Sequence, residues 1–174
     1  MLFDFRRSAN LILQESDSSC RWTAIFKECV FDRNSSGELL AAVDFSIEVS
    51  MPHFCGSTED RCYLPDLTAF RDGLRELLKK EAQEAQFNGL AASSICVYRN
   101  PRRLDYFISK GLVAFPHIRW NVDVAAENRP MTSSVETANE SRWAYEVDQT
   151  ALISLVRQLD SVIGEIESRA PHDD

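Results

Sequence analysis

The sequence lacks a long apolar run. Its longest aliphatic stretch covers only residues 39–43, whereas a membrane-spanning helix needs about 20 apolar residues. Its first ten residues place the charges after a very short apolar segment, which is the wrong order for a signal peptide. We therefore expect a cytoplasmic protein with no membrane partner. With 174 residues and 44% hydrophobic content, the chain fits one globular domain over residues 1–170, followed by a frayed tail over residues 171–174.

The residues needed for common catalytic and metal sites are also scarce. The six glycines are isolated, so no phosphate-binding loop is expected. Of three histidines, His172 lies in the tail, while His53 and His117 do not adjoin a nucleophile motif. His53, Cys55 and Cys62 are close in sequence, but structural zinc sites have paired cysteines and four ligands. We expect a polar loop here, no metal or other cofactor, and a protein that is not an enzyme.

Lysine and arginine are too few and too scattered for nucleic-acid binding, which requires clustered positive charge. The net charge is −8, made up of about −1 over residues 1–122 and −7 over residues 123–174. The acidic region permits a basic protein partner, or else serves only for solubility. The candidate partner-binding residues are acidic side chains on a strand and in this region: Asp44, Glu48, Asp123, Glu127, Glu136 and Glu140.

Strict alternation of apolar and polar residues predicts strands. In the segment 42–50, Val43, Phe45, Ile47 and Val49 face one way, opposite Asp44, Ser46 and Glu48. The same pattern predicts a strand over 117–125. Weaker strands are predicted over 10–14, 21–31, 93–99, 103–109 and 142–147, with turns at 33–38 and 99–103. Asp44 and Glu48 would lie about 13 Å apart along a regular strand, too far for the carboxylate pair of a glycosidase.

Helical periodicity appears in two segments, at about 65–83 and 149–168. The first carries the stripe Leu67, Phe70, Leu74, Leu77 and Leu78, and the second Leu152, Leu155, Val156, Leu159, Val162, Ile163 and Ile166. Asp66 either caps the first helix or lies in its first turn after Pro65. Gly73, inside that helix, predicts a close crossing against the sheet. Asp148 ends a strand and caps the second helix.

These elements predict an α+β fold, with two amphipathic helices packed on a largely antiparallel, curved sheet of about six to eight strands. Short connections between neighbouring strands exclude most parallel crossovers. Arg99, Arg102 and Arg103 flank a predicted turn. They are either solvated charges of that turn or a binding site for a phosphate or an acidic partner.

The order of elements resembles the WapI-like bacterial immunity proteins. The features that match are the strand "AVDFSIEVS", the helix "LPDLTAFRDGLRELLKK", the strands around "ICVYRN" and "GLVAFPHIRWNVDV", and the junction "RWAYEVDQTALISLVRQL". They cover roughly residues 10–165. The resemblance implies a protein that binds and neutralises a cognate, possibly basic, protein toxin, and it implies no catalytic residues.

Two alternatives stay open at this stage. One is a small ligand-binding or enzymatic α+β domain that uses the concave face of the sheet and the loop from His53 to Cys62. The other is a homo-oligomer built through the polar strand face, so the chain is either a monomer or a homodimer.

Overall fold

The computed structural model describes residues 1–5, 9–14, 20–51, 54–90, 93–102, 106–114, 119–120 and 140–171. It has two helices and antiparallel sheets, which confirms the predicted α+β class. The strands divide between two sheets, of six and four strands, where the sequence suggested one curved sheet. Within the described residues, no helix has the length and apolar character required to span a membrane.

The larger sheet, sheet A, contains the first five strands and one short later strand. They are β1 (Leu2–Asp4), β2 (Asn10–Gln14), β3 (Arg21–Arg33), β4 (Leu39–Met51), β5 (Phe54–Tyr63) and β9 (Arg119–Trp120). Their order is β1-β3-β4-β5-β9, and β2 also pairs with β3. The predicted turn at 33–38 closes the β3–β4 hairpin, where Gly37 adopts a positive φ of 84°. Of the strand expected over 117–125, β9 is the only part that lies in the described residues.

The smaller sheet, sheet B, contains β6 (Glu84–Asn88), β7 (Ser93–Arg99), β8 (Tyr106–Ala114) and β10 (Glu140–Asp148). Its order is β10-β8-β7-β6, and every pair is antiparallel. The predicted strands over 93–99, 103–109 and 142–147 correspond to β7, β8 and β10. The sequence analysis did not predict β1, β5 or β6.

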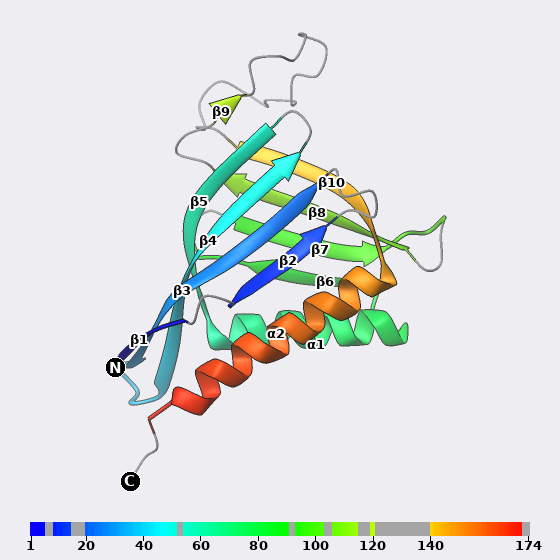
Figure 1. Cartoon of the computed structure of the whole chain (residues 1–174). Helices are drawn as coiled ribbons and strands as arrows, with labels where there is room; N and C mark the ends of the chain where they lie inside the picture. The colour runs from blue at the N-terminus through cyan, green and yellow to red at the C-terminus, as the bar shows by residue number, and fades with distance from the viewer. Residues whose placement is uncertain are drawn as a thin grey trace.

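Each helix follows the last main strand of one sheet and packs against a strand of the other. Helix α1 (Leu64–Lys79) continues directly from β5 and packs on β6, whereas α2 (Gln149–Arg169) continues from β10 and packs on β2. The helices also contact each other, at one end of both sheets (Figure 1). The chain therefore consists of two similar halves: the first half is β2–β5 with α1, and the second half is β6, β7, β8 and β10 with α2.

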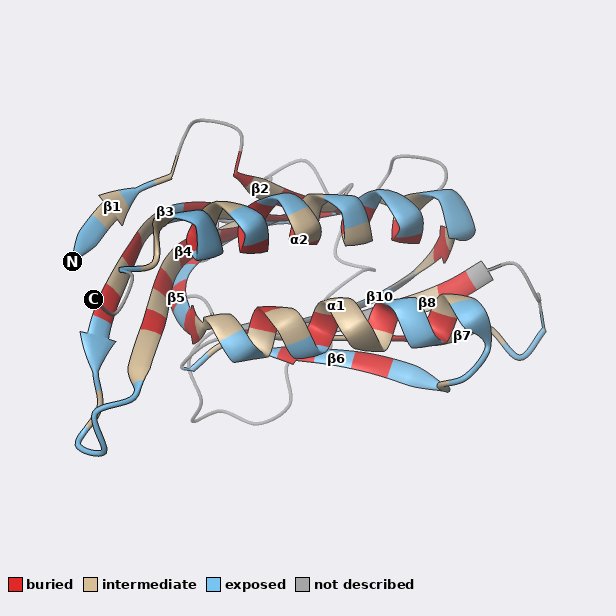
Figure 2. Ribbon diagram, turned by 90° about the horizontal axis from the view of Figure 1, so that it is seen from below, coloured by how far each residue is buried: buried red, intermediate tan, exposed pale blue. Residues whose placement is uncertain are grey.

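Apolar stripes explain why the helices sit there. Leu67, Phe70, Leu74 and Leu77 of α1 are buried, as are Leu152, Leu155, Leu159, Val162, Ile163 and Ile166 of α2. In Figure 2 the buried positions of α2 lie on its side toward α1. Leu78 and Val156, predicted for the same stripes, are half-buried at their margins. An amphipathic helix is held mainly by the apolar face it buries, so each helix fixes its own half to the other.

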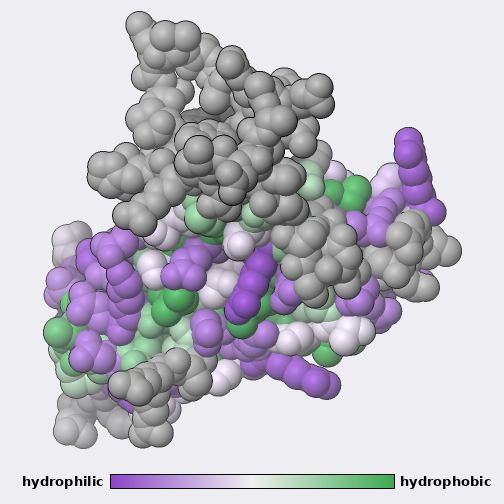
Figure 3. Space-filling model, turned by 45° about the horizontal axis from the view of Figure 1, so that its top comes forward, coloured by the Kyte–Doolittle hydropathy of each residue, from purple (hydrophilic) through white to green (hydrophobic). Residues whose placement is uncertain are grey.

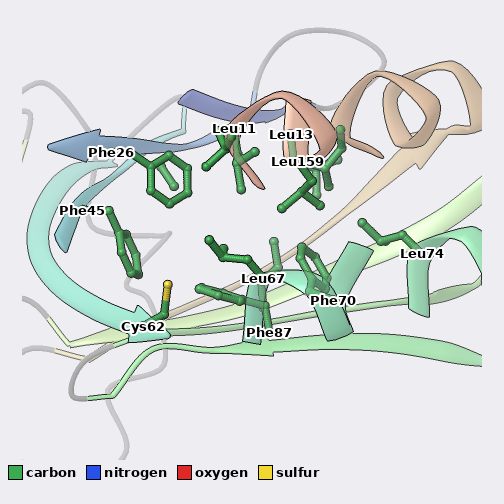
Figure 4. Close-up of a cluster of buried hydrophobic side chains, with 14 of the residues drawn as sticks. Leu11, Leu13, Phe26, Phe45, Cys62, Leu67, Phe70, Leu74, Phe87 and Leu159 are labelled. Atoms are coloured by element: carbon green, nitrogen blue, oxygen red, sulfur yellow. The ribbon is translucent and has the colours of Figure 1, made fainter. Parts of the chain in front are cut away.

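Seven of the ten phenylalanines form a continuous series through this core. The series runs Phe31, Phe3, Phe5, Phe26, Phe45, Phe87 and Phe70, and neighbouring ring centroids are 5.0 to 5.9 Å apart. Its fifth step joins Phe45 of β4 to Phe87 of β6, and so joins sheet A to sheet B. Figure 4 shows four of these rings, and two of them, Phe70 and Phe87, lie beside Leu67 of α1 and below Leu11, Leu13 and Leu159. Aromatic pairs at this spacing stabilise a core beyond their buried area.

Helix α1 ends earlier than the predicted boundary at residue 83. Lys80 adopts a left-handed backbone conformation with φ of 70°, and the Glu81 amide donates to the Glu76 carbonyl at 2.9 Å. This closure ends the helix at Lys79. The predicted close crossing at Gly73 is confirmed: a Cβ atom there would lie 3.2 Å from Cβ of Ala85 in β6.

Candidate partner-binding face

Strand β4 places the predicted acidic residues on the side of sheet A that faces away from the core. Val43, Phe45, Ile47 and Val49 are at most 2% exposed, so the alternating residues Asp44, Ser46 and Glu48 point to the opposite side. Glu48 is exposed and Asp44 is half-buried. The side assignment predicted from the sequence is thus confirmed for both carboxylates.

Neighbouring strands add further charges to this side. Strand β3 contributes Lys27 and Glu28, because a register shift between Phe26 and Glu28 inserts an extra residue and directs both side chains outward. Strand β5 contributes Glu59 and Arg61, which lie opposite Ser46 and Asp44 in register. We call this set the charged face of sheet A: Lys27, Glu28, Asp44, Glu48, Glu59 and Arg61.

Ion pairs order part of the charged face. Arg61 binds the Asp44 carboxylate in a two-point contact, with Nη2 donating to Oδ2 at 2.7 Å and Nε donating to Oδ1. The hydrogen bond from Arg61 lowers the pKa of Asp44 below its usual value, so Asp44 is ionised at neutral pH. Lys27 pairs with Glu59. Glu48 lies beyond these pairs, opposite Thr23 and Ser57.

An open hollow of about 730 Å³ lies against the charged face. The residues that line it include the acidic Asp4, Glu28, Asp44, Glu59 and Asp60 and the basic Lys27 and Arg61. Leu90 also lines it and is 55% exposed. Figure 3 shows one face of the molecule, where hydrophilic side chains surround small hydrophobic patches. The hollow therefore combines an acidic lining with an exposed apolar side chain.

Asp60 joins the hollow to sheet B. Its carboxylate is buried, accepts from the Ser93 hydroxyl at 2.6 Å and accepts from the Arg61 amide at 2.8 Å. Gly89 passes so close that a Cβ atom there would lie 2.0 Å from Oδ2 of Asp60. The Leu90 amide donates to the Arg61 carbonyl at 2.8 Å. These contacts hold the turn between β6 and β7 against β5.

The structure brings together only two of the six predicted partner-binding residues. Asp123, Glu127 and Glu136 lie outside the described residues. Glu140 begins β10 opposite Ala114, and only its backbone is described. The prediction for these four stays a prediction.

The predicted cap at Asp148 is confirmed. Asp148 has an extended backbone, and its Oδ1 accepts from the Ala151 amide at 2.8 Å. Thr150 lies in the first turn and is exposed. The strand-to-helix junction is accounted for by capping, which satisfies an amide that has no partner within the helix.

The predicted polar loop from His53 to Cys62 is wrong for most of its length, because residues 54–63 form β5. Cys55 is exposed, whereas Cys62 is fully buried in the core, seven residues further along the strand. Burial raises the pKa of the Cys62 thiol and raises that of Cys29 to about 11. Within the described residues, no three His, Cys, Asp or Glu side chains are grouped so as to hold a metal ion. His53 lies outside those residues.

Arg99 has a structural role that the sequence analysis did not propose. Its guanidinium donates to the carbonyls of Leu77 and Ala82, at and just beyond the C-terminal end of α1. A cation stabilises the negative end of a helix dipole. Arg102 is exposed and Arg103 lies outside the described residues.

Sequence reasoning missed five members of the site: Lys27, Glu28, Glu59, Arg61 and Leu90. The alternation in β5 was obscured because two polar residues, Thr58 and Asp60, occupy its buried positions at 7% exposure each. Every residue from 57 to 61 is polar, so no alternation indicates the strand there. No local signal gives the register that places Arg61 opposite Asp44.

Comparisons with known proteins leave the chain without a family. No protein-family model matches it, and no curated protein matches it. Among solved structures, the chain is similar to one described as crystal structures of Trypanosoma bruciei MRP1/MRP2. The identity is 11%, the match covers 93% of this chain and 86% of that chain, and the TM-score is 0.41.

Proposed function

We propose that the chain is a binding protein that neutralises a cognate bacterial toxin by direct contact, and that the charged face of sheet A meets the toxin. The observation that carries this proposal is the charged face itself: six charged side chains on three adjacent strands, beside an acidic hollow with an exposed leucine. Strands of one sheet hold side chains at fixed spacings, so the face can match a partner without reordering.

The charge of the face indicates the kind of partner. The lining of the hollow has an excess of carboxylates, and the chain as a whole carries −8. Complementary charge accelerates encounter with a basic protein and disfavours wrong partners. Leu90 supplies an apolar contact of the kind that contributes most to binding energy once it is covered. The partner we propose is a toxin with a basic surface.

The ion pair between Asp44 and Arg61 suits recognition better than acid–base chemistry. An acid catalyst near neutral pH needs a raised carboxyl pKa, whereas the pKa of Asp44 is lowered. The competing prediction of a ligand-binding or enzymatic domain relied on a loop from His53 to Cys62. Residues 54–63 of that stretch form a strand whose two cysteines lie in different environments, which favours the binding protein over this alternative.

The test needs a toxin candidate, which is to be sought among the genes that neighbour the gene for this chain. Binding and inhibition should be measured by calorimetry and by the toxin's own activity. The double variant Glu48→Lys/Glu59→Lys should bind at least about tenfold more weakly, because it places positive charge against a basic partner. The matched control, Glu76→Lys/Glu167→Lys, makes the same charge change at exposed helix positions and should bind like the wild type.

Two results would overturn the proposal. Absence of binding and inhibition by the wild-type chain would remove the immunity function. Equal loss of binding in the two double variants would show that only net charge matters and that the charged face is not the contact surface.

A further inference from the structure

The outer edge of β6 presents backbone groups that the rest of sheet B does not use. The Gly89 amide donates to Ser93, and the Arg99 amide donates to Gln83. Hydrogen-bonded and non-bonded pairs alternate along an antiparallel ladder, so Ala85 and Phe87 bond to β7. The N–H and C=O groups of Glu84, Gln86 and Asn88 therefore point away from the sheet.

Some of the corresponding groups of sheet A are hydrogen-bonded. On β2, the Ile12 amide donates to Oε1 of Gln158 in α2 at 2.6 Å. On β5, the Arg61 amide donates to Asp60, and the Arg61 carbonyl accepts from Leu90, both at 2.8 Å. Side chains and a turn thus block strand addition at these two edges of sheet A.

No such block is present on β6 among the described residues. None of them bonds to the outward backbone groups of residues 84, 86 and 88. Three features that often protect an edge are absent from β6: it contains no proline or lysine, and its register with β7 runs without a bulge. In Figure 2, β6 lies at the near edge of its sheet with α1 beside it.

We propose that β6 pairs with β6 of a second copy of this chain, antiparallel and about a two-fold axis at Gln86. This interface goes beyond the toxin-binding function and does not depend on it. The two four-stranded sheets become one eight-stranded sheet. The register places residue 84 opposite residue 88 of the second copy, and residue 86 opposite its own counterpart. All the outward groups then face each other, giving about two hydrogen bonds per facing pair.

The side chains of β6 fit this self-pairing. Glu84 lies opposite Asn88 of the second copy, so like charges are not opposed, and an amide faces a carboxylate. Asn88 uses its Oδ1 to accept from Gln86 at 3.1 Å, which leaves its amide N–H groups for that carboxylate. On the core side, small Ala85 lies opposite large Phe87 of the second copy. A pair of short strands buries less than the ~1,200 Å² typical of stable complexes, so the dimer should be weak and depend on concentration.

Sedimentation equilibrium of the full chain over a wide concentration range tests the proposal. The wild-type mass should rise from 19.8 kDa toward twice that value. Gln86→Pro removes the outward N–H but none of the amides that bond to β7, and proline is accepted at such edge positions. It should keep the mass at 19.8 kDa at every concentration. Gln86→Ala retains the N–H and should associate like the wild type.

A charge-swap pair tests the register and does not require proline to be accommodated. Gln86→Lys and Gln86→Glu should each associate about tenfold more weakly than the wild type, because the axis puts like charges opposite each other. An equimolar mixture of the two should associate at least as well as the wild type.

The proposal would be overturned by a wild-type chain that stays monomeric throughout, by association that persists in a folded Gln86→Pro variant, or by a charge-swap mixture that shows no recovery. Circular dichroism establishes that each variant is folded. Toxin binding by a purely monomeric chain would overturn this interface and leave the proposed function in place.

Discussion

The first and second halves of the molecule have the same order of elements, four antiparallel strands and then a helix, yet they close their polar groups differently. In the first half, the buried Asp60 carboxylate is hydrogen-bonded, and outward backbone groups of β2 and β5 are bonded. In the second half, β6 keeps an unbonded edge and the buried Ser109 hydroxyl has no partner among the described residues. The two halves therefore share a topology but differ in which of their edge and buried polar groups are hydrogen-bonded.

The largest effect is expected where the halves meet. Phe87→Ala removes the ring that contacts Phe45 of sheet A and Phe70 of α1. Because Phe87 is only 3% exposed, the free energy of unfolding should fall by about 3–5 kcal/mol, measured by urea denaturation. Phe3→Ala is the matched control, since Phe3 is partly buried and lies at the other end of the ring series. A larger loss for Phe3→Ala would contradict the view that the contact between Phe45 and Phe87 joins the halves.

The two strand-to-helix junctions should differ in sensitivity. Asp148→Ala removes the acceptor for the Ala151 amide inside the first turn of α2 and should lower the free energy of unfolding by about 1 kcal/mol. Asp66→Ala should cost less, because Asp66 bonds the Tyr63 amide outside the helix and Pro65 already favours the first turn. Toxin binding should be unchanged in a folded Asp148→Ala variant. Full stability with lost binding would make the junction a site.

Sequence predicted those parts of the fold that are governed by local patterns. Alternation placed Asp44 and Glu48 on the outer side of β4, and the junction residue Asp148 was identified as a cap because capping depends on residues three apart. The division into two sheets was not predictable from the sequence, because the residues of a turn do not show whether the strands on its two sides belong to the same sheet. The ion pair of Asp44 with Arg61 needs the register of β4 and β5, and the pairing of Asp60 with Ser93 joins residues 33 apart.

The glycines inside the two helices should respond in opposite directions to substitution. A Cβ atom at Gly164 of α2 meets nothing within 4 Å, so Gly164→Ala should stabilise the protein by up to about 1 kcal/mol through helix propensity. At Gly73 of α1, the same Cβ atom crowds Ala85 of β6 at 3.2 Å. That crowding should cancel or reverse the gain. Thermal denaturation of both variants measures this, and equal gains would show that α1 tolerates a wider crossing than the structure has.

Acid should weaken the ion pair within sheet A more than the one on α1. The pKa values of Asp44 and Asp72 are both lowered. The largest cause is a hydrogen bond from Arg61 to Asp44 and from Arg71 to Asp72. A lowered folded-state pKa stabilises the protein above the unfolded value of 3.8, and this contribution is lost as pH falls through the folded value. The Asp44 side chain is less exposed than that of Asp72, at 24% against 49%.

We therefore expect Asp44→Asn to reduce stability at neutral pH by less than about 1 kcal/mol, and Asp72→Asn to reduce it less. Both variants should converge on the wild type in strong acid, as followed by urea denaturation across the acid range. If the free energy of unfolding of Asp44→Asn fell with acid as steeply as that of the wild type, the ion pair of Asp44 with Arg61 would not be a source of the pH dependence.

The smallest effect should come from the unsatisfied hydroxyl of the second half. Ser109 is fully buried in β8, opposite Val97, and a buried hydroxyl without a partner is costly to keep. Ser109→Ala should therefore leave stability unchanged or raise it by up to about 1 kcal/mol, as measured by urea denaturation. Ser93→Ala deletes the same atom type but removes the hydrogen bond that the Ser93 hydroxyl donates to buried Asp60. It should therefore destabilise the protein. A comparable loss in the two variants would show that Ser109 has a partner in solution, and that the halves complete their buried polar groups alike.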